Sequence, residues 1–211
     1  MDEIKKQTPA ERTAHILSDF FSPLLTPTYG CFVALWLTSM AYLPVGIRLW
    51  TIVGIAAITA LAPATVIFVL IRLGKVSDTS ISDRRQRTIP YWTTIVCYIG
   101  ACVFLSVLKA PAWLVVFFSA AAVVSFIAMI ITHWWKISAH SASVAGLAGV
   151  IFWLARTGLI LHGPLVWVSL AFLLTGAIAW ARIYLNHHTL MQTFAGAILG
   201  FFVEYGMLCL L

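Results

Sequence analysis

The chain has 211 residues, of which 62% are hydrophobic and 9% are charged, and its mean hydropathy is +0.98. Soluble domains contain about 45–50% apolar and about 25% charged residues, so this chain has too little polar surface to cover a water-soluble globule. A soluble domain is therefore excluded. At about 20 residues per crossing, the apolar residues are enough for about six or seven transmembrane helices.

The charge and the cysteines point to no other class of protein. The net charge of +6 comes from 13 basic and 7 acidic side chains, which is too sparse for a nucleic-acid surface, so we expect no nucleic-acid partner. The four cysteines lie inside apolar stretches and have neither metal-ligand nor disulfide spacing. The polar N-terminus lacks a short apolar core with a cleavage site, so we expect no cleaved signal.

The first predicted element is an amphipathic helix over residues 10–25, which has apolar side chains at helical spacing and ends before Pro27. This pattern is typical of a helix that lies in the membrane interface. We therefore divide the chain into an N-terminal polar and amphipathic interfacial segment, residues 1–28, and a transmembrane helical bundle, residues 29–211.

Seven apolar runs follow, separated by polar residues or by proline and glycine. They cover residues 29–47, 50–72, 91–108, 111–132, 141–161, 164–181 and 189–211. Arg156 interrupts the fifth run. We expect an all-α integral membrane protein, a bundle of six or seven transmembrane helices preceded by the interfacial helix.

Most polar side chains of the bundle are predicted to meet on one membrane face. With alternating crossings, the loops after the second, fourth and sixth runs open on the same side as the N-terminus. These loops hold Lys75, Asp78, Asp83, Arg84, Arg85, Arg87, His133, Lys136, Ser138, His140, Arg182, Tyr184, Asn186, His187 and His188. Cationic and imidazole groups that converge beside lipid are typical of a site for an anionic headgroup. The expected partner is an anionic lipid in the bilayer.

The first candidate motif runs from Asp83 to Pro90 and contains three arginines, Arg84, Arg85 and Arg87. Guanidinium groups form charge-assisted, fork-like hydrogen bonds with phosphate oxygens. Taken alone, the run is better explained as a positive-inside topology signal between two hydrophobic segments.

The second motif, residues 136–141, begins the fifth run. Ser138 is predicted to be the N-cap of that helix, where free backbone N–H groups of the first turn favour an anion. His140 in the same turn could act as a general acid. The alternative is a polar residue that only lies at the membrane interface.

The third motif, residues 181–192, joins the last two helices, and Arg182 precedes His188 by six residues. Gln192 lies one helical turn after His188, so its amide could bond the imidazole and select its tautomer. The alternative is a solvated connecting loop. The pair His187-His188 suggests a metal, but no carboxylate or cysteine set has the spacing to complete a site, so we predict none.

In this order, the three motifs resemble the type 2 phosphatidic acid phosphatase superfamily, whose pattern is KxxxxxxRP, PSGH and SRxxxxxHxxxD. The third motif matches best, with Ala181 in place of the serine and Gln192 in place of the aspartate. The second keeps Ser138 and His140 but lacks the proline and glycine. In the first, Arg87-Thr88 replaces Arg-Pro and Ser80 stands at the lysine position. The resemblance covers about residues 75–200.

The resemblance implies a membrane lipid phosphatase that needs no metal or other cofactor and forms a phosphohistidine. In that mechanism His188 is the nucleophile and His140 is the acid that protonates the leaving group. The phosphate-binding candidates are Arg84, Arg87, Arg182 and Ser138. The supporting candidates are Lys75, Arg85, Lys136 and Gln192. The charge of the absent motif lysine could come from Lys75, Arg84 or Arg85.

The resemblance also implies a bacterial inner-membrane location and a substrate such as undecaprenyl diphosphate, phosphatidylglycerophosphate, phosphatidate or a lipid A phosphate. Because the motif lysine, proline and aspartate are replaced, the alternative is a catalytically weak or inactive relative that binds or moves an anionic lipid. The positive-inside rule favours a cytoplasmic site, whereas family members that process carrier lipids often work from the outer face. The sequence is compatible with a site on either membrane face.

The last apolar run contains two further features. Gly196 and Gly200 have the spacing of a close helix-packing face. Glu204 is the one carboxylate deep in an apolar run, and counting residues along the helix predicts that it lies toward the far end of the bundle from the site.

Overall fold

The computed structural model describes residues 8–77, 81 and 83–211, so Asp78, Ser80 and the first seven residues of the interfacial segment lie outside the described part. Within the described residues all regular structure is helical and there is no strand. The first half contains α1 (Pro9–Phe20), α2 (Thr26–Leu37), a 3₁₀ turn (Ser39–Tyr42), α3 (Val45–Ala56), a π turn (Ala57–Leu61) and α4 (Ala62–Arg72). The second half contains a 3₁₀ turn (Arg84–Arg87), α5 (Thr88–Val107), α6 (Ala112–Trp134), α7 (Ala139–Arg156), α8 (Pro164–Tyr184) and α9 (Leu190–Leu208). The predicted all-α fold is confirmed.

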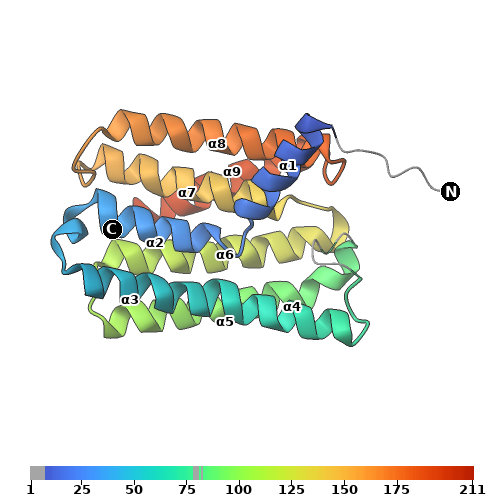
Figure 1. The fold of residues 1–211 in the computed structure, drawn as a ribbon, viewed down its shortest axis with the longest axis horizontal. Coiled ribbons are helices and arrows are strands. Elements are labelled where there is room, and N and C mark those ends of the chain that lie inside the picture. Colours follow the sequence, from blue (N-terminus) through green and yellow to red (C-terminus); the bar gives the residue numbers. More distant parts are fainter. Residues whose placement is uncertain (1–7, 78–80, 82) are drawn as a thin grey trace.

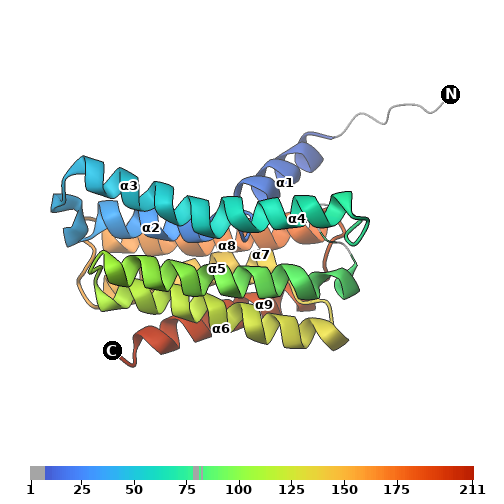
Figure 2. The same cartoon turned by 90° about the horizontal axis from the view of Figure 1, so that it is seen from below.

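Five of these helical segments are long and apolar enough to cross a membrane, which makes this a multi-pass membrane protein. They are Val45–Arg72, Arg84–Val107, Ala112–Trp134, Pro164–Tyr184 and Leu190–Leu208. Helices α2 and α7 lie among them in the bundle, and α1 crosses obliquely at one end (Figures 1 and 2). The first turns of α1, α2 and α8 each contain a proline, where its missing N–H has no helical partner to lose.

The polar connections meet at one end of the bundle, as the alternation of crossings predicts. The connections α4–α5, α6–α7 and α8–α9 lie at the same end as the start of α1, and the C-terminus lies at the opposite end (Figure 1). All three sequence motifs belong to these connections or to the helix starts beside them. The fold therefore brings the motifs together at one membrane face.

Helix α7 is the centre of the C-terminal half, because eleven of its 18 residues are buried. It packs in parallel along α9 through glycines. A Cβ atom on Gly196 would lie 2.5 Å from the Ser138 carbonyl oxygen, and one on Gly200 would lie 1.9 Å from that of Ala142. Only a residue without a Cβ atom allows the two backbones to lie this close, so the close-packing face is confirmed.

We expect Gly200→Ala to destabilise the bundle by about 1–3 kcal/mol, because the added methyl group collides with backbone that cannot rotate away. Thermal unfolding in detergent measures this loss. Gly206→Ala is the matched control on the same helix, since nothing lies within 4 Å of a Cβ atom there. Equal melting temperatures for the two variants would contradict the packing argument.

Candidate active site

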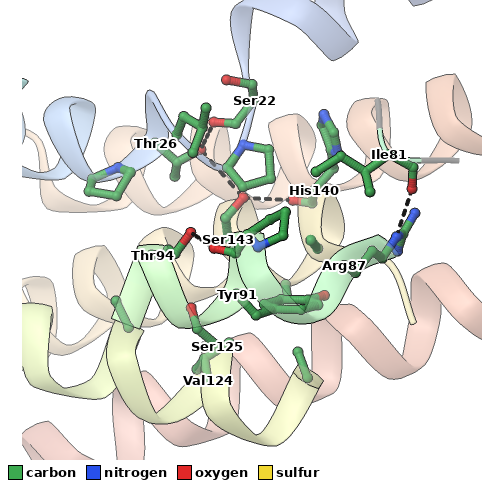
Figure 3. Close-up of a pocket in the computed structure, with 18 of the residues that line it drawn as sticks. Ser22, Thr26, Ile81, Arg87, Tyr91, Thr94, Val124, Ser125, His140 and Ser143 are labelled. Carbon is green, nitrogen blue, oxygen red and sulfur yellow. Dashed lines mark hydrogen bonds between the residues drawn. The ribbon is translucent and has the colours of Figure 1, made fainter. Parts of the chain in front are cut away.

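A cavity of about 340 Å³ opens among α1, α2, α5, α6 and α7. Arg87, His140, Arg182 and His188 all line it, and Figure 3 shows the first two beside polar residues of α2, α5 and α6. These four residues come from the three different sequence motifs. The fold thus gathers two guanidinium groups and two imidazoles around one hollow.

Hydrogen bonds join the three motifs to one another. Arg87 donates through Nε to the Ile81 carbonyl at 2.9 Å and through Nη1 to the Ile137 carbonyl at 3.3 Å, which ties the first motif to the second. The Ser138 backbone N–H donates to the Gln192 carbonyl at 3.2 Å, which ties the second to the third. The relative positions of the motifs are therefore set by backbone as well as side-chain contacts.

The turn after α8 brings His188 back to Arg182. The backbone N–H groups of His187 and His188 both donate to the Arg182 carbonyl, at 3.1 and 3.3 Å. Asn186 has a φ of +54°, a left-handed conformation that asparagine tolerates better than most side chains. This turn accounts for the spacing of six residues between the arginine and the histidine.

Arg182 is buried, with 4% of its surface exposed, and its guanidinium is only partly satisfied. Nη1 donates to the Ser18 hydroxyl of α1 at 2.5 Å, while Nε has no hydrogen-bond partner within the described residues. A buried guanidinium with a spare donor is costly unless an anion completes it. The spare donor makes this part of the cavity suited to a phosphate oxygen.

Helix α1 contributes to the site in a way that the sequence argument missed. Ser18 and Asp19 line the cavity, although α1 was expected only to lie at the interface. Ala14 and Ser18, one turn apart, are the buried residues of α1, and the helix packs against α8. A pair of small residues at this spacing is the signal of helix packing that could have indicated the contact.

Gln192 lies within hydrogen-bond distance of the His188 imidazole. Its Oε1 atom lies 3.1 Å from Nδ1 of His188 and 3.2 Å from the Thr189 backbone nitrogen. The Thr189 N–H can only donate, so it requires the amide oxygen and not the NH₂ group at this place. His188 Nδ1 must then carry the proton, and Nε2 holds the lone pair.

His188 is a neutral imidazole in this environment. Burial, and then the charges of Arg87 and Arg182, lower the pKa of His188 to about 3. Charging this ring beside two guanidiniums in a desolvated cavity is unfavourable. A neutral ring with the lone pair on Nε2 is the form that can act as a nucleophile.

We expect ¹⁵N spectra of histidine-labelled protein to show His188 as the neutral Nδ1–H tautomer from about pH 8 to about pH 5, where an ordinary histidine protonates. A His188→Asn sample assigns the signal. Gln192→Leu should lose the tautomer preference. Because the unfolded chain protonates this histidine first, stability should fall as the pH drops below about 6.5. Protonation of His188 near the usual pKa would contradict this electrostatic description.

The other predicted site residues lie outside the cavity lining. Ser138 is the N-cap of α7, as predicted, and its Oγ accepts from the backbone N–H of Ser141 at 3.3 Å and from its hydroxyl at 3.1 Å; it is fully buried. Arg84 donates to the His133 carbonyl at 3.0 Å. Lys75 and Arg85 are exposed, and Lys136 is half-buried. Of these, Lys136 is close enough to affect His188 electrostatically.

Glu204 lies on the cavity, not remote from it as the sequence argument expected. The reason is the parallel packing of α7 and α9, in which a Cβ atom on Gly146 would lie 3.0 Å from Cγ of Glu204. Gly146 is only six residues, or less than two turns, after His140. The cavity reaches inward to this level, so a residue deep in α9 shares it with the cations.

Residues 119–211 match the family model of the PAP2 superfamily. The matched range contains His140, Arg182 and His188, and it spans α7 to α9 with the last two thirds of α6. Neither a curated protein nor a solved structure matches the chain. The match confirms the predicted superfamily for residues 119–211, the C-terminal part of the chain, and PAP2 is a phosphatase family. The match therefore supports a phosphoester hydrolase of the lipid phosphatase type.

Proposed function

We propose that this PAP2 protein is a lipid phosphatase that removes phosphate from a lipid phosphate or diphosphate. The observation that carries the proposal is that Arg87, His140, Arg182 and His188 line one cavity. Phosphoryl transfer requires positive charge around the equatorial oxygens and a nucleophile in line with the leaving group. Two guanidinium groups and a neutral imidazole supply both requirements.

In the first step Nε2 of His188 attacks phosphorus. A P–N bond forms while the P–O bond to the lipid alkoxide, or to a lipid monophosphate in a diphosphate, breaks. His140 gives its proton to the departing oxygen. A phosphate dianion between the two guanidiniums favours the protonated form of this imidazole, because an opposite charge stabilises a cation.

In the second step water hydrolyses the phosphohistidine. The water oxygen bonds to phosphorus, the P–N bond breaks, and its electron pair returns to Nε2 of His188. His140 accepts a proton from the water and inorganic phosphate leaves. The proposed chemistry uses no metal ion, since the two arginines neutralise the charge that metal ions neutralise elsewhere.

The amide at position 192 is compatible with turnover. In a serine protease an Asp→Asn change beside the histidine costs about 10⁴ in rate because it leaves the wrong tautomer. Here the Thr189 N–H requires the amide oxygen of Gln192 to face the ring, so the tautomer is the productive one. Only the charge stabilisation of an aspartate is absent, which favours an active enzyme over an inactive lipid-binding relative.

The proposed substrates are anionic lipids of the bacterial inner membrane, such as phosphatidate, phosphatidylglycerophosphate, undecaprenyl diphosphate or a lipid A phosphate. Their hydrocarbon chains stay in the bilayer while the phosphate enters the cavity. We propose that residues 1–28 lie at the interface beside the mouth and that residues 29–211 form the bundle. The charge of the connections favours a cytoplasmic mouth.

Release of inorganic phosphate from these four lipids by the purified full chain, in detergent with EDTA, tests the proposal. We expect release from at least one of them that is unchanged by EDTA. Binding of a lipid without any release would replace the proposal by a non-catalytic lipid-binding role. A strict requirement for added metal would contradict the metal-independent mechanism.

A further inference from the structure

Glu204 gives the cavity a group whose chemistry is opposite to that of the two guanidinium groups. The side chain is 3% exposed, and its Oε2 atom has no hydrogen-bond partner in the described part of the chain. An unpaired buried carboxyl group is costly. Gly146 on α7 leaves the space that this side chain occupies, since a Cβ atom there would lie 3.0 Å from its Cγ atom.

Hydroxyl groups add further acceptors to the cavity wall. Thr94 and Ser143 line the cavity (Figure 3). Each already uses its proton, Thr94 by donating to the Pro90 carbonyl at 2.9 Å and Ser143 by donating to the His140 carbonyl at 3.0 Å. Ser143 Oγ also accepts from the Thr26 hydroxyl at 3.4 Å, and the remaining lone pairs of the two oxygens are what they offer to a ligand. With Glu204, they add acceptors to a wall that also holds the phenol groups of Tyr91 and Tyr98.

Arg87 and Arg182 offer the complementary groups, because a guanidinium group can only donate. A cavity that holds guanidinium donors as well as carboxyl and hydroxyl acceptors matches a ligand with a phosphate and hydrogen-bond donors near it. A plain hydrocarbon next to the phosphate would leave the carboxyl group of Glu204 desolvated and unpaired. An ammonium group would satisfy it only at the cost of burying two charges.

We propose that Glu204 binds a free hydroxyl on the group esterified to the phosphate, so the preferred substrate carries its phosphate on a polyol or sugar. This inference rests on the proposed function and narrows its substrate class. The hydroxyl proton is donated to the Glu204 carboxyl group while the phosphate is held by Arg87 and Arg182. Glu204 is then a residue that determines specificity and takes no part in bond breaking.

The test compares phosphatidylglycerophosphate, which has a free hydroxyl beside its phosphate, with phosphatidate, which has none. We expect wild-type protein to prefer the first in kcat/KM. Glu204→Leu should lower that preference at least about tenfold, mainly through KM, because the hydrogen-bond partner of the hydroxyl is lost. Glu204→Gln keeps an accepting oxygen and should retain most of the preference. Phe202→Leu, which changes a lipid-facing side chain of α9, is the matched control.

Binding separates this inference from the proposed function. The dissociation constants of both lipids, measured with His188→Asn and with the His188→Asn/Glu204→Leu double variant, do not depend on hydrolysis. A preference for the hydroxylated lipid that disappears in the double variant would support the role of Glu204 even if wild-type protein released no phosphate. An unchanged preference, an equal loss for both lipids, or tighter binding of an aminated lipid phosphate would overturn it.

Discussion

Replacing His188 by asparagine is expected to reduce phosphate release by at least about 10³-fold, since it removes the group that forms the covalent intermediate. Asparagine keeps an N–H near the position of Nδ1, so the hydrogen bond to Gln192 and the turn after α8 should persist. The measurement is phosphate release in detergent at saturating lipid. Unchanged thermal unfolding would show that the loss is chemical.

The neighbouring histidine is the control for this experiment. His187 precedes His188 in the same turn but does not line the cavity, so His187→Asn should keep activity within a few fold. Wild-type protein denatured during turnover with a ³²P-labelled lipid should retain acid-labile label, and His188→Asn should retain none. Activity above about a tenth of wild type in His188→Asn would eliminate the covalent mechanism.

The helical bundle was predictable because the bilayer requires its spanning segments to be apolar, and such segments can be recognised in the sequence. Apolar runs of about 20 residues must form helices there, since every backbone group has to be satisfied within its own segment. Because successive helices cross the membrane in opposite directions, every second connection lies on the same membrane face. This is why the convergence of Arg87, His140, Arg182 and His188 followed from the order of the runs, before any contact between helices was known.

The wall of the cavity was less predictable, because it depends on contacts between residues far apart in the chain. Ser18 and Arg182 are separated by 164 positions, and no local pattern relates them. The prediction that Glu204 lies far from the site was wrong, because counting residues along α9 does not show how α9 is placed against α7. Even so, the packing that brings Glu204 to the cavity depends on the small residues that the sequence does reveal.

Arg182→Met is expected to lower kcat/KM by about 10²–10³, the usual effect of losing one preorganised donor to a developing oxyanion. The same change should leave the melting temperature unchanged or raise it. The guanidinium is buried and its Nε has no hydrogen-bond partner within the described residues, and replacing such a group by an apolar side chain removes its desolvation cost. Loss of activity without loss of stability indicates a group held in place for its ligand.

Arg182→Lys separates charge from geometry. Lysine restores a point charge but not the fork that contacts Ser18 and a phosphate oxygen together, so we expect it to recover only part of the activity. Inorganic phosphate or vanadate should raise the melting temperature of wild-type protein by mass action, and this shift should be smaller in Arg182→Lys and absent in Arg182→Met. A full shift in the methionine variant would mean that the anion binds without Arg182. Since Arg87 is already engaged by two backbone carbonyls, Arg182 has the larger unused donor capacity, and most of the anion affinity should depend on it.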